Sequence, residues 1–290
     1  MNSLSDIEIS TLLRKYGVQP KKKRGQSFLK DQNIAQEIVR AAEITTDDTV
    51  LEIGGGLGVL TKWLAEEAGH VYVIEIEACL VDALTDLFRE TKNVTIIKGD
   101  ALTIGLPQVT KVVSNLPYSI SSEITFRLLR DVNFDWAILM YQKEFANRLG
   151  ARPGSEDYSR LTINFQYLAE AEPIMEIPSR MFYPQPVVDS IVVRIRRRPH
   201  DPQARDIEIF QWMINGIYSY PKKSLRNALR IWFKTLGVER NLAEEVIEQS
   251  EAGLTGDEHL RGISIESLVV LADTIFEFVR DGKLPKARGS

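Results

Sequence analysis

Apolar segments of four or five residues alternate with helical patterns along the first half of the chain. We expect strands at 50–53, 71–75, 94–97, 111–114 and 136–140, and helices at 34–42, 60–68, 78–89, 121–130 and 142–149. Near-continuous apolar strands between helices are typical of a parallel sheet that is covered on both faces. The pattern therefore predicts an α/β domain, with a short amphipathic helix at 7–16 before it.

The pattern changes toward the C-terminus. A helix at 161–168 precedes two late strands, at 174–177 and 190–196, which we expect to form an antiparallel pair. Beyond Asp206 every predicted element is helical: 207–219, 224–236, 242–250 and 264–279. Because Pro199 and Pro202 separate the two patterns, we predict one domain at 1–200 and a smaller, all-helical domain at 201–290.

A glycine-rich turn at 54–58 follows the first strand of the predicted sheet. Glycines let backbone N–H groups approach a ligand, and the helix that follows favours oxygen-rich groups at its N-terminus. A dinucleotide fingerprint that begins at Gly54 needs glycine where Val59 stands, and no Gly-Lys-Ser/Thr completes a phosphate-binding loop. The remaining G-x-G-x-G resembles the motif of S-adenosylmethionine methyltransferases. A glycine turn without a ligand is the alternative.

Acidic residues end the next two strands. Glu75 is placed to accept both ribose hydroxyls of an adenosyl group, and Asp100 to accept from an adenine amino group. For each acid, a helix cap or a pair with a surface lysine is the alternative. Their order after the glycine turn favours an adenosyl ligand. We expect Glu52, in the first strand, to brace the turn by accepting backbone N–H bonds.

The segment Asn115-Leu116-Pro117-Tyr118 ends the fourth predicted strand. Asparagine offers a side-chain oxygen, proline leaves nearby carbonyls as acceptors only, and tyrosine offers a flat face for stacking. Two acceptors and an aromatic face suit an exocyclic amine on a planar ring. They hold its hydrogens while the nitrogen turns toward an incoming methyl group, so no strong base is needed. A strand-ending turn with a core tyrosine is the alternative.

Composition excludes several classes of function. Hydrophobic residues make up 44% and charged residues 26% of the chain, as in ordinary soluble globular proteins. The single cysteine, Cys79, excludes an internal disulfide and a multi-thiolate site, and the three histidines lack ligand spacing, so we expect no metal. No apolar run approaches membrane-spanning length, and we expect a cytoplasmic protein without a membrane partner.

The formal net charge is −4, yet positive residues gather at 21–24, 194–198 and 222–234. Each cluster alone is equally compatible with a solvated face. Three clusters in one acidic chain favour a directed basic surface that binds nucleic acid.

Further segments narrow the resemblance to one family. Segment 25–31, Gly-Gln-Ser-Phe-Leu-Lys-Asp, resembles the G-Q-x-F-L-x-D segment of the KsgA/RsmA-type rRNA adenine N6,N6-dimethyltransferases. Segment 182–190 is similar to their F-x-P-x-P-x-V-D-S, segment 220–227 to their basic R-K-x-L-R-N helix, and segment 261–264 to their R-x-x-x-L-S turn. The resemblance covers about residues 20–280, and the combination is far more specific than any one motif.

The resemblance implies a Rossmann-like, class I methyltransferase fold with a seven-stranded, mostly parallel sheet and a smaller all-α C-terminal domain. It implies that S-adenosylmethionine donates methyl groups to N6 of two adjacent adenosines, in a hairpin loop near the 3′ end of small-subunit rRNA. The partner would be this rRNA or the pre-ribosomal particle, bound by a monomer during ribosome biogenesis. The alternatives are an assembly or transcription factor that needs no catalysis, and a DNA adenine or large-subunit rRNA methyltransferase.

The resemblance also assigns residues. Asn115 with the carbonyl of Leu116 or Pro117 would hold the target amine, and Tyr118 and Phe182 would sandwich the adenine. The expected donor contacts are Gln26, Ser27, Leu29, Gly54, Gly56, Glu75, Ile76, Asp100, Ala101 and Asn115. The expected RNA contacts are Lys22, Lys23, Arg24, Lys222, Lys223 and Arg226. Ser27 stands where the family often has Asn or His, and Val187 replaces a frequent lysine.

Overall fold

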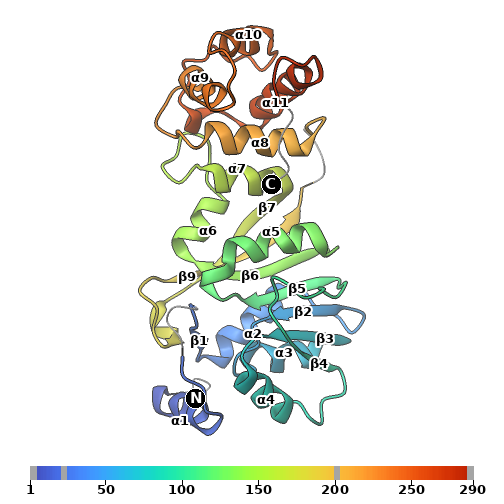
Figure 1. The fold of residues 1–290 in the computed structure, drawn as a ribbon. Coiled ribbons are helices and arrows are strands. Elements are labelled where there is room, and N and C mark those ends of the chain that lie inside the picture. The colour runs from blue at the N-terminus through green and yellow to red at the C-terminus, as the bar shows by residue number, and fades with distance from the viewer. Residues whose placement is uncertain (1–4, 21–24, 199–202, 286–290) are drawn as a thin grey trace. The chain divides into compact units, whose positions relative to one another are not determined.

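The computed structural model describes residues 5–20, 25–198 and 203–285 (Figure 1). Contacts divide the chain into two compact units, 1–146 with 170–197, and 147–169 with 198–290. The chain therefore enters the second unit twice. The segment 147–169 belongs to the second unit by its contacts, although the sequence analysis assigned it to the first domain. The expected boundary near residue 200 stays a prediction.

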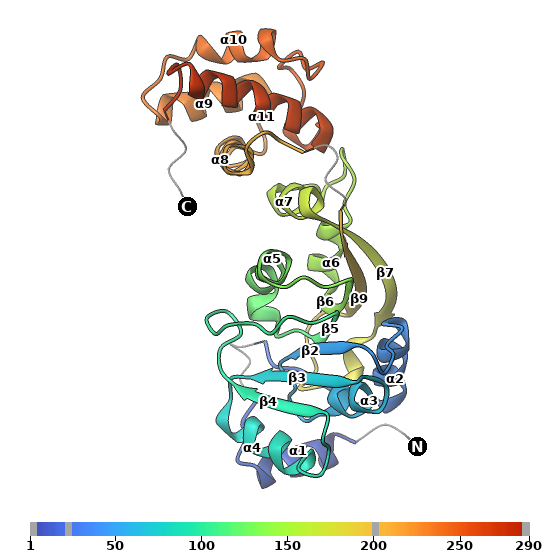
Figure 2. The same cartoon turned by 90° about the vertical axis from the view of Figure 1, so that its right-hand side faces the viewer.

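The first unit is built on a seven-stranded sheet in the order β4-β3-β2-β5-β6-β9-β7. Its strands are β2 (Thr49–Ile53), β3 (His70–Glu75), β4 (Val94–Lys98), β5 (Lys111–Asn115), β6 (Trp136–Gln142), β7 (Ala169–Ile177) and β9 (Ser190–Arg197). Strands β2 to β6 pair in parallel, as β2, β3 and β4 show in Figure 2, and β9 pairs antiparallel with β6. The predicted α/β class with a mostly parallel, seven-stranded sheet is confirmed.

The helices of the first unit begin and end near their predicted limits. They are α1 (Asp6–Lys15), α2 (Gln32–Ala41), α3 (Val59–Glu67), α4 (Ala78–Leu87) and α5 (Ser121–Asp131), with the start of α6 (Lys143–Leu149). Asp31 caps α2 by accepting from the backbone N–H groups of Asn33 and Ile34 at 2.8 and 3.2 Å. Ile38 of α2 and Leu64 of α3 are buried in one core cluster with residues of the sheet.

A second, two-stranded sheet joins segments that are far apart in the sequence. β1 (Phe28–Leu29) pairs antiparallel with β8 (Phe182–Tyr183). This pairing was not predicted from the sequence. It lays the segment before α2 against the segment that carries Phe182. Helix α1 packs on the same region, because its Ile9 and Leu13 share a buried cluster with Phe28.

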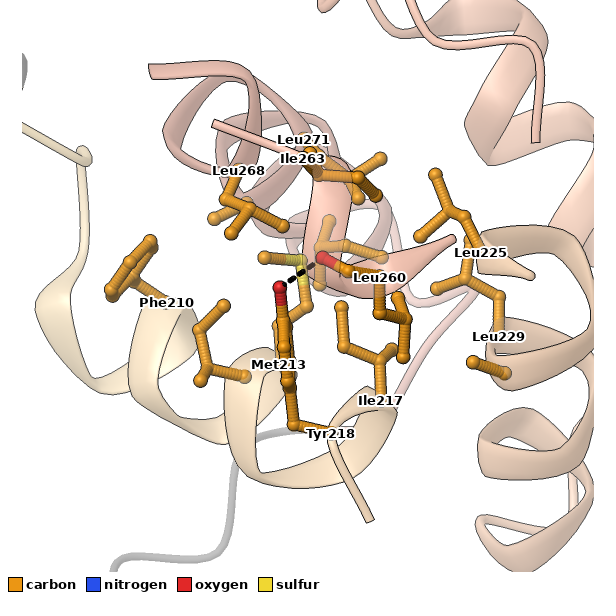
Figure 3. Packing of buried hydrophobic residues seen from close by; sticks show 14 of the residues in the cluster. Phe210, Met213, Ile217, Tyr218, Leu225, Leu229, Leu260, Ile263, Leu268 and Leu271 are labelled. Atoms are coloured by element: carbon orange, nitrogen blue, oxygen red, sulfur yellow. Dashed lines mark hydrogen bonds between the residues drawn. The ribbon is translucent and has the colours of Figure 1, made fainter. Parts of the chain in front are cut away.

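The second unit is helical. Its helices are α7 (Arg160–Leu168), α8 (Ile207–Ile217), α9 (Leu225–Thr235), α10 (Leu242–Gln249) and α11 (Ile265–Arg280). Figure 3 shows Met213 and Ile217 of α8 among buried side chains from α9 and α11. The Tyr218 hydroxyl donates to the carbonyl oxygen of Leu260 at 2.6 Å within this core. Gly216 permits the close approach of α8 and α9, because a Cβ there would lie 2.3 Å from the Trp232 ring.

Among the described residues, no helix combines the length and the apolar character needed to cross a membrane.

Candidate functional site

The order of the strands opens a crevice at one edge of the sheet. The chain runs from β2 outward through β3 and β4, and then returns to place β5 on the other side of β2. In open parallel sheets, ligands bind at such a reversal, outside the carboxyl ends of the strands. The pairing of β2 and β5 extends only to Leu51 and Val112. Beyond it, the backbone N–H of Ile53 donates at 2.8 Å to the side-chain hydroxyl of Ser114, a residue of β5.

A cavity of about 270 Å³ lies at this edge. It is enclosed by the glycine turn after β2, the ends of β3 and β4, the end of β5, and segment 25–29. Every residue expected to contact the methyl donor lines it: Gln26, Ser27, Leu29, Gly54, Gly56, Glu75, Ile76, Asp100, Ala101 and Asn115. The structure thus brings these ten side chains and backbone segments together. That they bind the donor stays a prediction.

The glycine turn has a backbone that other residues rarely adopt. Gly54, Gly56 and Gly58 have φ of 76°, 56° and 75°, in the left-handed region. Space is short as well, because a Cβ on Gly54 would lie 3.3 Å from the Pro117 ring, and one on Gly56 would lie 3.2 Å from the Phe28 ring. The turn can therefore carry backbone against a ligand but not side chains, which is what a nucleoside cradle requires.

Glu75 fastens this turn to the end of β3. Its Oε2 accepts from the Gly56 N–H at 3.1 Å, and its Oε1 accepts from the N–H groups of Ile76 and Glu77 at 2.9 and 3.0 Å. The residue is 4% exposed, and this burial raises the pKa of the carboxyl despite the three backbone donors. A carboxylate has about four acceptor positions, so one position remains after these three bonds, enough for one ribose hydroxyl.

Glu52 behaves differently from the sequence-based expectation. Its Oε2 accepts from the Thr61 hydroxyl of α3 at 2.6 Å, rather than from backbone N–H groups of the turn. The pKa of Glu52 is raised to about 8, mainly because the carboxyl is buried. The hydrogen bond from Thr61 lowers this pKa, and the charge of Glu75 raises it further. Glu52 lines the cavity and is 2% exposed, so it keeps its proton at neutral pH.

Asn115 lines the cavity and carries a buried acceptor without a partner among the described residues. Its Nδ2 donates to the carbonyl oxygen of Ser27 at 3.1 Å. Because that carbonyl can only accept, the orientation of the carboxamide is fixed, with Oδ1 on the other side. Oδ1 is buried and has no hydrogen-bond partner in the described part of the chain. A buried acceptor left without a donor costs about 1–3 kcal/mol, and in a residue that lines the cavity it is a candidate acceptor for a donor group of a ligand.

Tyr118 and Phe182 lie outside the lining of the cavity. The Tyr118 hydroxyl shares a 2.8 Å hydrogen bond with the Ser190 hydroxyl, and burial raises the pKa of the phenol. Phe182 is 1% exposed and belongs to the same core cluster as Leu29, with which it pairs. The adenine sandwich stays a prediction, and it requires the Phe182 ring to become accessible when RNA binds.

The residues expected to bind RNA fall into three groups. Lys22, Lys23 and Arg24 lie outside the described residues. Lys222 and Lys223 are exposed on the loop before α9. Arg226 is held inside the second unit, since its guanidinium pairs with Glu244 and Asp257 and donates to the carbonyl oxygen of Thr255. Their contact with RNA stays a prediction, and these bonds compete with such a role for Arg226.

No group of three or more His, Cys, Asp or Glu side chains with the geometry of a metal site occurs in the described segments.

Comparison with known proteins gives concordant results. The family model described as ribosomal RNA adenine dimethylase matches residues 17–268. A protein of Methanosarcina mazei named probable ribosomal RNA small subunit methyltransferase A is 46% identical over 224 residues, which cover 76% of this chain and 81% of that protein. A crystal structure of a dimethyladenosine transferase from Plasmodium falciparum has a TM-score of 0.76 at 26% identity, over 89% of this chain and 99% of that chain. A structure of the 23S rRNA methyltransferase ErmE has a TM-score of 0.64 at 28% identity, over 86% and 99%.

Proposed function

The chain belongs to the ribosomal RNA adenine dimethylase family, and on that premise we propose that it dimethylates N6 of two adjacent adenosines in small-subunit rRNA. The methyl donor of this family is S-adenosylmethionine. We further propose that the adenosines lie in the hairpin loop near the 3′ end, because unpaired loop bases can be splayed into a pocket at modest cost. The acting species would be a cytoplasmic monomer on a pre-ribosomal small subunit.

The residues of the cavity fit the donor. At Gly54 and Gly56 the turn admits backbone where a Cβ would crowd Pro117 or Phe28, and Glu75 and Asp100 carry acceptors at neighbouring strand ends. When bound there, the sulfonium supplies an activated methyl group. The protein's own contribution is to hold the donor through these groups and to enclose it in the cavity.

The observation that carries the proposal is the unpaired Oδ1 of Asn115. An exocyclic adenine amine has two hydrogens to donate, and Oδ1 would accept one of them while a carbonyl of Leu116 or Pro117 accepts the other. Both residues line the same cavity. Held in this way, the nitrogen turns its lone pair toward the methyl group. The methylated amine then releases its proton, so alignment rather than a strong base accelerates the reaction.

Two observations bear on the alternatives. The relative at 46% identity is named for the small subunit, whereas the 23S rRNA methyltransferase structure is 28% identical, which favours the small-subunit target. A factor without catalysis has no need of an unpaired acceptor beside a nucleoside cradle. The intact glycine turn and Asn115 therefore favour an enzyme over a purely structural assembly factor.

The test is the substitution Asn115→Ala, with transfer of labelled methyl groups to small subunits that lack the modification. We expect kcat to fall about 100- to 1000-fold, as when one preorganised hydrogen-bonding group is removed from a reacting centre. Asn133→Ala is the matched control, because Asn133 is exposed and does not line the cavity. Full transfer by the Asn115 variant would reject the mechanism. Primer extension on rRNA from a deletion strain identifies the subunit, and a stop lost from the large-subunit rRNA would reject the target.

A further inference from the structure

Consecutive residues in the wall of the cavity are fastened to the segment that carries Phe182. The Ser27 hydroxyl donates to the carbonyl oxygen of Pro184 at 3.1 Å. Phe28 and Leu29 then form β1, which pairs with β8. The backbone N–H of Lys30 donates to the carbonyl oxygen of Met181 at 2.9 Å. The wall on the donor side and the segment expected to bind adenine are therefore held together along residues 27–30.

Ser27 is the residue of this wall that also contacts Asn115. Its carbonyl oxygen accepts from Asn115 Nδ2 at 3.1 Å, while its hydroxyl is bonded to Pro184 on the opposite side. One residue thus connects the side chain that would hold the target amine with the segment that would stack on the target ring. The hydroxyl, although it belongs to a cavity-lining residue, is already used in a bond within the protein.

We infer that Ser27 is a positioning residue for methyl transfer, an inference that rests on the proposed function. It fixes Asn115 and the Phe182 segment in one arrangement, and its hydroxyl serves the adenine side of the site rather than binding the methyl donor. The two contacts can be separated by mutation. Any substitution keeps the backbone carbonyl and hence the bond from Asn115, so a change at the side chain tests the hydroxyl alone.

Ser27→Ala removes the hydroxyl and its bond to Pro184 while the backbone carbonyl stays. Loss of one neutral hydrogen bond should lower kcat/KM for unmethylated small subunits about fivefold. The dissociation constant for S-adenosylhomocysteine, measured by calorimetry, should stay within twofold of the wild type, which also shows that the variant is folded. Ser27→Thr keeps a hydroxyl on the same backbone position and should restore most of the lost activity.

A second measurement separates coupling from a general loss of stability. The affinity for small subunits is measured with and without saturating S-adenosylhomocysteine. In the wild type, ordering of segment 27–30 by the nucleoside should strengthen RNA binding, and the ratio of the two affinities reports the coupling. In Ser27→Ala this ratio should fall about fivefold, whereas Ser27→Thr should retain it.

Two results would overturn the inference. Ser27→Ala with weakened nucleoside binding, but a normal rate at saturating donor, would make the hydroxyl a donor ligand. Ser27→Ala with every constant unchanged would make the hydroxyl idle. Failure of the proposed function looks different, because the wild-type protein itself would then leave small subunits unmethylated.

Discussion

The buried carboxyl of Glu52 makes the stability of the protein depend on pH in a direction opposite to that of most acidic residues. Its pKa is raised from 4.5 to about 8 in the folded protein, mainly by burial. Above about pH 4.5 the unfolded chain releases this proton while the folded protein keeps it. The free energy of unfolding therefore falls by about 1.4 kcal/mol for each pH unit up to about 8, where the loss is complete. The total is at most about 5 kcal/mol.

Glu52→Gln removes this ionisation but keeps the shape of the side chain and an acceptor for Thr61. We expect the variant and the wild type to be similar in stability near pH 5. By pH 8 the variant should be more stable by up to about 4 kcal/mol, on the order of 10 °C in melting temperature. Glu75, whose pKa is raised in the same direction, is present in both proteins, so the difference between them reports the ionisation of Glu52 together with its interaction with the charge of Glu75.

The measurement is urea unfolding followed by circular dichroism at pH 5, 6, 7 and 8, without nucleoside. Glu66→Gln is the matched control, because Glu66 is an exposed acid on α3, the helix that carries Thr61, the partner of Glu52. The control should follow the wild-type slope. Parallel slopes for Glu52→Gln and the wild type would refute the reasoning, since they would mean that Glu52 is ionised in the folded state at neutral pH.

Two further predictions concern the second unit. Replacing both Lys222 and Lys223 with alanine should weaken binding of small-subunit rRNA and leave the melting temperature unchanged. The slope of the logarithm of the binding constant against the logarithm of the salt concentration should become shallower by about 1 for each lost phosphate contact. As a contrast, Arg226→Ala breaks bonds within the unit and should lower the melting temperature. An unaltered salt slope in filter-binding assays would remove the lysines from the interface. Tyr218→Phe removes one of the two hydrogen bonds that the carbonyl oxygen of Leu260 accepts, because the backbone N–H of Ile263 also donates to it at 3.3 Å. The variant should lose about 0.5–1.5 kcal/mol in urea unfolding, and an unchanged free energy of unfolding would contradict this assignment.

The sheet was predictable from the sequence because its strands have strong local signals. Each parallel strand is a near-continuous apolar run, and the predicted limits differ from the observed ones by at most two residues. The ten expected donor-binding residues could be assembled from the rule that parallel strands end at one edge, together with the family's segments. The late strand β7 begins at Ala169 rather than at residue 174, because its exposed, charged residues hide the pattern.

Other features depend on contacts that leave no periodic signal. Strands β1 and β8 are two residues long and lie about 150 positions apart, so neither shows alternation. The partner of Glu52 is Thr61, a polar residue at a core-facing position of α3, where the sequence suggests only helix. Arg226 resembles a free basic residue until the fold places its partners beside it, Glu244 of α10 and Asp257 of the loop that follows α10.

The double passage of the chain into the helical unit affects how the protein is made. The Tyr158 hydroxyl donates a hydrogen bond to the carbonyl oxygen of Ile263, which is synthesised 105 residues later. Helix α7 likewise packs against α8 and α11, which are both synthesised after it. Helix α7 therefore emerges with its apolar face uncovered. Helix α8 can cover part of this face first, and the covering is complete only after α11 has been synthesised. A protein shortened after residue 198 would keep that face exposed permanently and would be prone to aggregate. A chimaera that exchanges the helical unit between relatives therefore has to include residues 147–169 in the exchanged part.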